Sequence, residues 1–230
     1  MPGGLEYQAQ QQMKPLILLN FKTYPKAVGK KALLLAKKLE KVKTKKYDIV
    51  IAPSLPTLEE VAAGTSLIVF SQHTDLAGLG AYTGKISAQE LKKIGVKGTL
   101  LNHSERKIPF SILKKIVADC KKHKLITVVC ASSLEETKQA AKLVPDFLAY
   151  EPPELIGGNV SVTNAKPKII SKAVELVKKI SPKTKVLCGA GVQSREDILK
   201  ALELGTKGVL IGHAVPKAKD PAKFLKGLLS

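Results

Sequence analysis

Short apolar segments that alternate with stretches of helical periodicity constrain the fold of this chain more than any other feature. The apolar segments are rich in β-branched residues. Eight of them recur along the 230 residues, at Leu16–Leu19, Ile49–Ala52, Leu67–Phe70, Gly98–Leu101, Ile126–Cys130, Phe147–Tyr150, Val186–Cys188 and Gly208–Ile211. Helical spacing appears between them at Ala32–Leu39, Ile112–Cys120, Ile169–Val177 and Ile198–Leu204. The pattern predicts strands and helices in alternation, which is typical of an α/β protein with parallel strands.

Residues that favour helix starts follow several of the predicted strands. Three segments have the form of a capping box, in which a hydroxyl side chain and a glutamate three residues later satisfy exposed amides: Thr57-x-x-Glu60, Ser87-x-x-Glu90 and Ser133-x-x-Glu136. Lys166-Pro167 and Asp220-Pro221 place proline where the first helical turn tolerates it. These signals predict helices that begin shortly after their strands.

Eight strand–helix units fill the chain and leave no room for a second domain. We therefore predict a single (β/α)8 barrel over residues 14–230. Residues 1–13 are polar and aperiodic, and we interpret them as a flexible extension or a tag remnant. A doubly wound open sheet is the alternative. It usually has fewer strands and would carry a G-x-G-x-x-G turn after its first strand, where this chain has Asn20-Phe21-Lys22.

The net charge of +19 leaves three interpretations: a nucleic-acid-binding surface, an anionic substrate, or an exterior covered by lysine. Arg106 and Arg195 are the only arginines, and the chain has no tryptophan. Base readout and base stacking depend on these residue types. The lysines instead lie in pairs on predicted helix faces, as at Lys37-Lys38. We therefore predict a solvated lysine exterior and expect no nucleic-acid partner.

Cysteine usage and hydropathy bear on metal sites and location. Cys120, Cys130 and Cys188 are odd in number and show no C-x-x-C spacing, so the sequence predicts neither a disulfide framework nor a metal site. A reducing cytoplasm is the expected location. No segment has the form of a signal peptide or reaches the roughly 18 apolar residues of a membrane span. We therefore expect no membrane partner.

Polar residues follow the predicted strands at the points where each strand ends. In a closed β/α barrel, residues just after the strands all face one mouth, so distant parts of the sequence converge there. The polar segments are Asn20–Lys22, Asn102–Arg106, Glu151–Glu154, Gly189–Gly191 and Gly212–His213. This mouth would hold a carboxylate, an imidazole and an ammonium group together with two glycine-containing turns.

Six motifs near these positions resemble the triosephosphate isomerase family, in its short archaeal form. They are N-F-K-T-Y from Asn20, G-A-Y-T-G-K-I-S from Gly80, N-H-S-E-R from Asn102, Y-E-P-P-E-L-I-G from Tyr150, L-C-G-A-G-V from Leu187 and G-V-L-I-G from Gly208. The resemblance extends from Pro15 to Ser230 and follows the order of the family. It implies a TIM barrel that interconverts dihydroxyacetone phosphate and D-glyceraldehyde 3-phosphate through an enediolate, in glycolysis and gluconeogenesis, without a cofactor.

The family is itself a standard example of barrel catalysis, so the resemblance implies a role for each matching residue. Glu151 would be the base that moves the proton, although a lone glutamate after an apolar run is more often a surface ion-pair partner. His103 would be the electrophile, kept neutral by a helix start after it; an isolated histidine there could equally be a core residue. Lys22 would place an ammonium beside the oxyanion and the phosphate. Asn20 would add a donor, and Glu105 would support Lys22 by pairing with it.

The resemblance also implies a phosphate site made of backbone amides, to which glycine allows close approach. The candidates are Gly189, Gly191, Gly212 and His213, joined by Gly157 from a lid that would run from Pro152 to about Val160. Alone, a G-x-G segment usually marks only a turn. A closed lid would exclude water and prevent loss of phosphate from the enediolate.

Two positions depart from the family pattern. Asn159 stands where a glycine is common in the lid, which could slow its hinge. His213 stands where a small residue usually follows the last strand. We hypothesise that the imidazolium form of His213 strengthens phosphate binding below about pH 6.5, the ordinary value for this side chain.

The resemblance finally implies self-association, because the family is dimeric and its archaeal members are usually tetrameric. A homodimer or homotetramer is therefore expected, with Gly80–Ser87 resembling the loop that reaches into a neighbouring subunit's site. Two other functions stay open. Another phosphate-binding barrel isomerase would keep the glycine turns but would not explain His103 together with Glu151. A barrel that binds nucleic acid through its charge would show steeply salt-dependent affinity.

Overall fold

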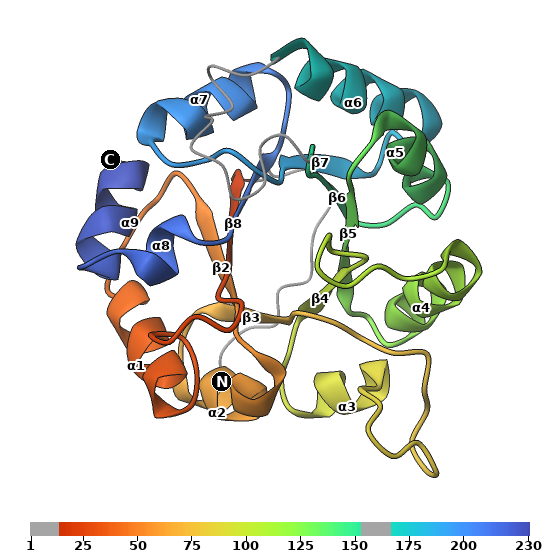
Figure 1. Ribbon diagram of the computed structural model, residues 1–230, viewed down its shortest axis with the longest axis horizontal. Helices are drawn as coiled ribbons and strands as arrows, with labels where there is room; N and C mark the ends of the chain where they lie inside the picture. The colour runs from red at the N-terminus through yellow and green to blue at the C-terminus, as the bar shows by residue number, and fades with distance from the viewer. Residues whose placement is uncertain (1–13, 153–166) are drawn as a thin grey trace.

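A computed structural model describes residues 14–152 and 167–230 as a closed barrel of parallel strands surrounded by helices (Figure 1). The strands lie in sequence order around the barrel: β1 (Leu16–Asn20), β2 (Asp48–Ala52), β3 (Ile68–Ser71), β4 (Gly98–Leu101), β5 (Ile126–Ala131), β6 (Phe147–Tyr150), β7 (Lys185–Cys188) and β8 (Gly208–Ile211). The predicted (β/α)8 barrel is therefore confirmed. The doubly wound sheet is excluded, because β1 pairs with β8 and closes the ring.

The helices follow the strands and form an outer layer. They are α1 (Lys30–Leu39), the 3-10 turn η1 (Leu55–Thr57), α2 (Leu58–Gly64), α3 (Ala88–Lys93), α4 (Phe110–Lys122), α5 (Leu134–Ala141), α6 (Pro167–Ile180), α7 (Arg195–Glu203), α8 (Ala214–Lys217) and α9 (Pro221–Leu229). The predicted extension at residues 1–13 and most of the predicted lid, with Gly157 and Asn159, lie outside the described residues.

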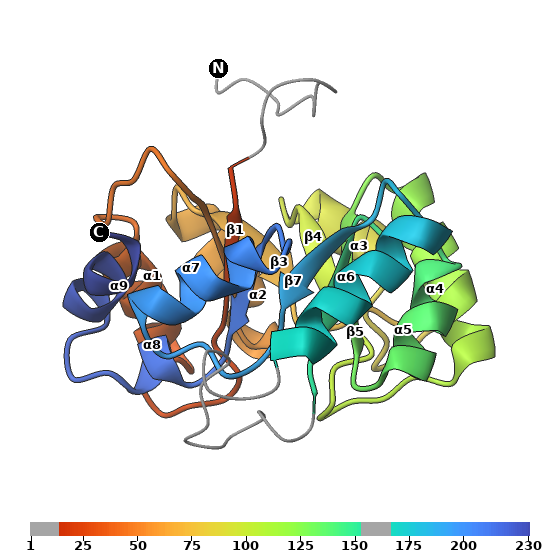
Figure 2. The same ribbon diagram turned by 90° about the horizontal axis from the view of Figure 1, so that it is seen from above.

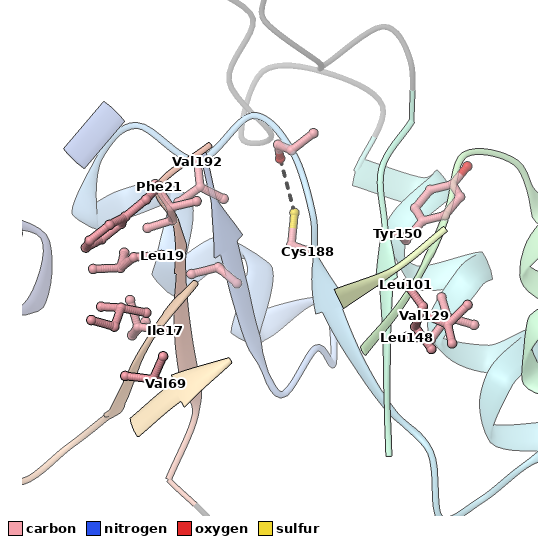
Figure 3. Close-up of a cluster of buried hydrophobic side chains, with 14 of the residues drawn as sticks. Ile17, Leu19, Phe21, Val69, Leu101, Val129, Leu148, Tyr150, Cys188 and Val192 are labelled. Carbon is pink, nitrogen blue, oxygen red and sulfur yellow. Dashed lines mark hydrogen bonds between the residues drawn. The ribbon is translucent and has the colours of Figure 1, made fainter. Parts of the chain in front are cut away.

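Successive residues of each strand pack into two different cores. Ile17 and Leu19 of β1 belong to a cluster that includes the buried faces of the helices, whereas Leu16 and Leu18 belong to a second cluster made of strand residues alone. Figure 3 shows Ile17, Leu19 and the following Phe21 on one side of β1. Because side chains alternate across a strand, the second cluster fills the barrel interior.

The inward series of side chains continues past the last residues of the strands and ends in polar groups. On β1, Leu16 and Leu18 are followed by Asn20. On β6, Phe147 and Ala149 are followed by Glu151. The same alternation turns Gly189, after β7, and Gly212, after β8, toward the interior. The barrel mouth is therefore built from positions that share the register of the inner core.

The hydroxyl half of the predicted capping boxes forms at two of the three sites. The hydroxyl of Ser87 accepts a hydrogen bond from the Glu90 amide at the start of α3, and the hydroxyl of Ser133 accepts one from the Glu136 amide at the start of α5. The capping prediction for Thr57 is wrong, because η1 precedes α2 and the Thr57 hydroxyl donates to the carbonyl of Ser54 at 3.0 Å instead. At Ser194 the structure adds a complete capping box, which starts α7 and was not among the predicted ones.

A side view places the mouth at one end of the barrel. In Figure 2 the strands run from the top of the picture toward the bottom, and α8 lies at the lower side, close to where β8 ends. No helix within residues 14–152 and 167–230 is both long and apolar enough to cross a membrane.

Candidate active site

A pocket lies at the carboxyl ends of the strands. The ends of β1 and β8 and the segments that follow β1, β4, β6, β7 and β8 contribute its lining. The lining consists of Asn20, Lys22, His103, Glu151, Gly189, Ala190, Gly191, Val192, Leu210, Ile211, Gly212, His213 and Ala214. Every predicted site residue in the described ranges belongs to this lining except Glu105. Glu105 contacts two of the lining side chains, as described next.

Lys22 extends into the pocket from an unusual backbone conformation. Its φ angle is 47°, in the left-handed region that side chains rarely adopt. Two neighbours hold it there: the Lys22 amide donates to Asn20 Oδ1 at 3.0 Å, and Gln72 Nε2 donates to the Lys22 carbonyl at 3.2 Å. The ammonium Nζ lies 2.7 Å from Glu105 Oε1. Lys22 is therefore fixed at its backbone and at its charged end.

The backbone amide of Glu105 determines which nitrogen of His103 carries the proton. This amide donates to His103 Nδ1 at 3.2 Å, so Nδ1 acts as an acceptor and the ring proton is directed to Nε2. The expected helix start after His103 is wrong. A turn follows instead, in which the Arg106 amide donates a hydrogen bond to the His103 carbonyl at 2.8 Å. The helix α4 begins only at Phe110.

His103 and Glu151 face each other across the pocket. His103 Nε2 lies 3.3 Å from Glu151 Oε1, and the two side chains are 11% and 4% exposed. Beneath them is Cys130, whose thiol pKa is raised well above its usual value, first by burial and then by the charge of Glu151. A carboxylate and an imidazole N–H thus share a site that is largely closed to water.

Gly189 leaves the space that the Glu151 side chain occupies. A Cβ atom at this position would lie 2.5 Å from Glu151 Cγ and 2.9 Å from the Tyr150 carbonyl oxygen. The Gly189 amide donates to that same carbonyl at 2.8 Å, within the barrel hydrogen bonding. Gly189 therefore contributes space to the pocket. Its amide already donates to the Tyr150 carbonyl and does not point to a ligand.

A second part of the pocket lining combines the cationic side chain of Lys22 with glycines and His213. Gly191 has a φ angle of 72°, which glycine adopts without strain. His213 lines the pocket just before α8, and its pKa is lowered by burial and then by the charges of Lys217 and Lys22. Because this pKa is lowered, the free protein carries a charged His213 only at a pH below the ordinary imidazole value. A stronger attraction of an anion by this side chain is therefore expected at lower pH than the hypothesis above states.

A sequence model of triosephosphate isomerase matches residues 15–228 of this chain. The chain belongs to the triosephosphate isomerase family. The triosephosphate isomerase of Methanothermus fervidus is 42% identical over 219 residues, which cover 94% of this chain and 98% of that protein. The enzyme of the same name from Methanosarcina mazei is 43% identical over 216 residues, 94% of this chain and 97% of that protein. The one from Archaeoglobus fulgidus is 40% identical over 215 residues, 93% and 96% of the two chains.

The structure adds residues to this triosephosphate isomerase site that the motifs alone did not single out. Gln72 holds the Lys22 backbone, and Asn102, at φ 58°, directly precedes His103. Glu136 contacts Asn102 from α5. An asparagine at a strand end is a known signal for the left-handed conformation, but no local signal connects Glu136 to the pocket. In the described ranges, no group of three or more His, Cys, Asp or Glu side chains is placed to hold a metal ion.

Proposed function

We propose that this chain interconverts dihydroxyacetone phosphate and D-glyceraldehyde 3-phosphate. The observation that carries the proposal is the pairing of Glu151 with a His103 imidazole whose proton is directed to Nε2, 3.3 Å from the carboxylate. A proton shuttle between adjacent carbons needs such a base beside such a donor. Relatives of nearly equal length carry the name triosephosphate isomerase and support the same reaction.

Glu151 acts as the base in this proposal. Its carboxylate takes a proton from C1 of the ketone, the electron pair of the broken C–H bond forms a C1=C2 double bond, and the carbonyl oxygen on C2 becomes an oxyanion. Glu151 then returns its proton to C2, while the hydroxyl proton on O1 moves to O2 and leaves a carbonyl at C1. The small exposure of Glu151 supports this role, because water is kept from the carboxylate and from the intermediate.

His103 and Lys22 stabilise the charge that develops on the substrate oxygens. A neutral imidazole donates its Nε2 hydrogen to the oxyanion without first carrying a charge of its own. Lys22 supplies a positive charge, and Asn20 keeps its amide nitrogen available because only its Oδ1 accepts from Lys22. Glu105 supports both groups, through its backbone amide for His103 and through its carboxylate for Lys22.

The phosphate binds on the positive wall of the pocket. We assign it to Lys22, to His213 and to the backbone around Gly191 and Gly212, where little side-chain bulk stands between the backbone and a ligand. Gly189 contributes space for Glu151 rather than an amide. The contribution of Gly157 from the lid stays a prediction, as does the effect of Asn159.

Self-association and location belong to the same proposal. The loop between β3 and α3 projects away from the barrel (Figure 1), and it exposes Leu76, Leu79 and Tyr82 by 41%, 50% and 49%. These apolar side chains support a homodimer or homotetramer, which sedimentation equilibrium at several salt concentrations measures directly. The three buried free thiols support a cytoplasmic location.

The test is a coupled spectrophotometric assay with D-glyceraldehyde 3-phosphate. We expect rapid conversion by the wild type and a kcat lower by roughly 10²- to 10⁴-fold in Glu151→Gln, which keeps the side-chain size but removes the base. Glu135→Gln is the control, because it removes the same charge from an exposed position on α5. A Glu151→Gln enzyme within a few-fold of wild type would show that Glu151 is not the base. An inert wild type that still binds sulfate would indicate another barrel isomerase.

A further inference from the structure

Glu136 departs from the capping geometry that its sequence position predicts. Ser133 accepts the Glu136 amide at 3.1 Å, as in a capping box. The Glu136 carboxylate does not complete the box. It accepts instead from the amide and the hydroxyl of Ser132, at 2.6 Å and 2.7 Å. The carboxylate therefore binds the residue between β5 and the helix N-cap rather than the amide of the N-cap itself.

Two further donors from the segment after β4 meet the same carboxylate. Asn102 Nδ2 lies 2.7 Å from Glu136 Oε1, and Lys107 Nζ lies 2.7 Å and 2.9 Å from the two oxygens. Burial alone would raise the pKa of Glu136, but the bonds from Lys107, Ser132 and Asn102 lower it overall. Glu136 thus stays ionised at neutral pH, and charge-assisted bonds of this kind are stronger than neutral ones.

Asn102 is the link between Glu136 and the pocket. Its Nδ2 also donates to the Cys130 carbonyl at 2.9 Å, and its Oδ1 accepts the Ile108 amide at 2.9 Å. These bonds tie the end of β4 to the end of β5 and to the loop that follows. They hold Asn102 at φ 58°, a conformation that asparagine adopts more readily than most residues but that is still unfavourable without such support.

The conformation of Asn102 decides the direction of the next residue, His103. A left-handed residue at a strand end turns the chain sharply, so a change in its φ would rotate the imidazole away from Glu151. We propose that Glu136 is a positioning residue that acts through Asn102 to hold His103 Nε2 toward the reacting oxygens. This inference rests on the isomerase function proposed above, and it adds a residue that lies outside the pocket lining.

A double-mutant cycle tests the route from Glu136 through Asn102. Asn102→Gly removes the side-chain bonds but keeps access to the left-handed backbone. We expect Glu136→Gln and Asn102→Gly each to lower kcat by roughly 10- to 100-fold with a nearly constant KM, the loss that a misplaced catalytic group causes. We expect the double variant to be no slower than the slower single variant, because both changes break one route.

Glu135→Gln is the matched control, because it removes the same charge from the same turn of α5 at an exposed position; its kcat is expected to stay within about twofold of wild type, as for an ordinary surface change. The proposal would be overturned if the loss of kcat in the double variant equalled the product of the two single losses, or if only KM rose. A lowered melting temperature with an unchanged kcat would also overturn it, because Glu136 would then serve stability only.

Nitrogen NMR of the imidazoles provides a readout that does not depend on turnover. The chain has only four histidines, so His103 is identified by comparison with His103→Gln. In wild type we expect the neutral tautomer with the proton on Nε2, and in Glu136→Gln a changed Nδ1 signal as the Glu105 amide bond weakens. An unchanged His103 signal would contradict the inference. An inactive wild type with this NMR change would contradict the proposed function and leave the link from Glu136 to His103 supported.

Discussion

The two walls of the pocket are built in different ways. The acid–base wall comprises His103 and Glu151, which lie 3.3 Å apart and are mostly removed from water. Behind this wall, outside the lining, directional hydrogen bonds hold Asn102 and Glu136. The anion wall, which comprises Lys22, Gly191, Gly212 and His213, depends instead on small residues and on positive charge.

The difference follows from what each wall has to do. Proton transfer needs atoms placed within a fraction of an ångström, so one misplaced group costs much of the rate. A phosphate group has three equivalent outer oxygens and a charge that acts over several ångströms, so its binding tolerates small displacements. Substitutions on the acid–base wall should therefore change kcat, and substitutions on the anion wall should change KM by smaller factors.

The largest expected difference comes from adding one methyl group to each wall. A Cβ at position 189 would lie 2.5 Å from Glu151 Cγ and close to backbone, whereas a Cβ at position 212 would lie 3.2 Å from the flexible end of Lys22. We expect Gly189→Ala to lower kcat by about 100-fold through displacement of Glu151. Gly212→Ala should raise KM roughly two- to fivefold, the scale of a weakened exposed charge contact. Steady-state kinetics of the pair measure both effects, and a Gly189→Ala enzyme changed in KM alone would break the comparison.

Glu105 contacts both walls through different atoms and gives a finer test. Glu105→Gln keeps the backbone amide that bonds His103 Nδ1 but removes the charge that pairs with Lys22. Because the Glu105 side chain is 61% exposed, we expect only a roughly two- to fivefold rise in KM. The nitrogen NMR signal of His103 should keep the pattern of a proton on Nε2, with only a small shift from the loss of the carboxylate charge 3.7 Å from Nδ1. A large loss of kcat would mean that the carboxylate also serves the acid–base wall.

The smallest expected effect is the pH dependence at His213. Its pKa is lowered in the free protein by burial and by Lys217 and Lys22, and a bound anion raises it again. Protonation therefore favours anion binding, and the affinity rises as the pH falls toward the lowered pKa of His213. Competitive inhibition by sulfate, which stays dianionic in this range, should strengthen about two- to fivefold more in wild type than in His213→Ala between pH 7 and 5. Equal pH profiles would remove His213 from the anion wall.

The parts that sequence predicted correctly are those with a local pattern. The apolar segments locate the strands, and because inward and outward residues alternate, the inward Phe147 and Ala149 place Glu151 inside the mouth. The glycines after β7 are also evident in the sequence. Whether Gly189 provides an amide or only space depends on Glu151, which follows a different strand, β6.

The parts that sequence did not predict depend on contacts between distant segments. The bond between Asn102 and Glu136 joins residues 34 positions apart, and Ser133-x-x-Glu136 alone indicates only a helix start. The turn after His103 was mistaken for a helix start because Ser104 and Glu105 suit either structure. At Thr57, a preceding 3-10 turn took the hydroxyl that would have capped α2.

The pairing of β1 with β8 has a consequence for folding. The register that places Leu16 against Gly208 and Leu19 against Ile211 joins the two ends of the chain, and it also brings Lys22 beside Gly212. Contacts between such distant segments form late, because a long loop must close first. During refolding, recovery of sulfate binding would therefore time the closure of the ring, while far-ultraviolet circular dichroism would report the earlier formation of helices.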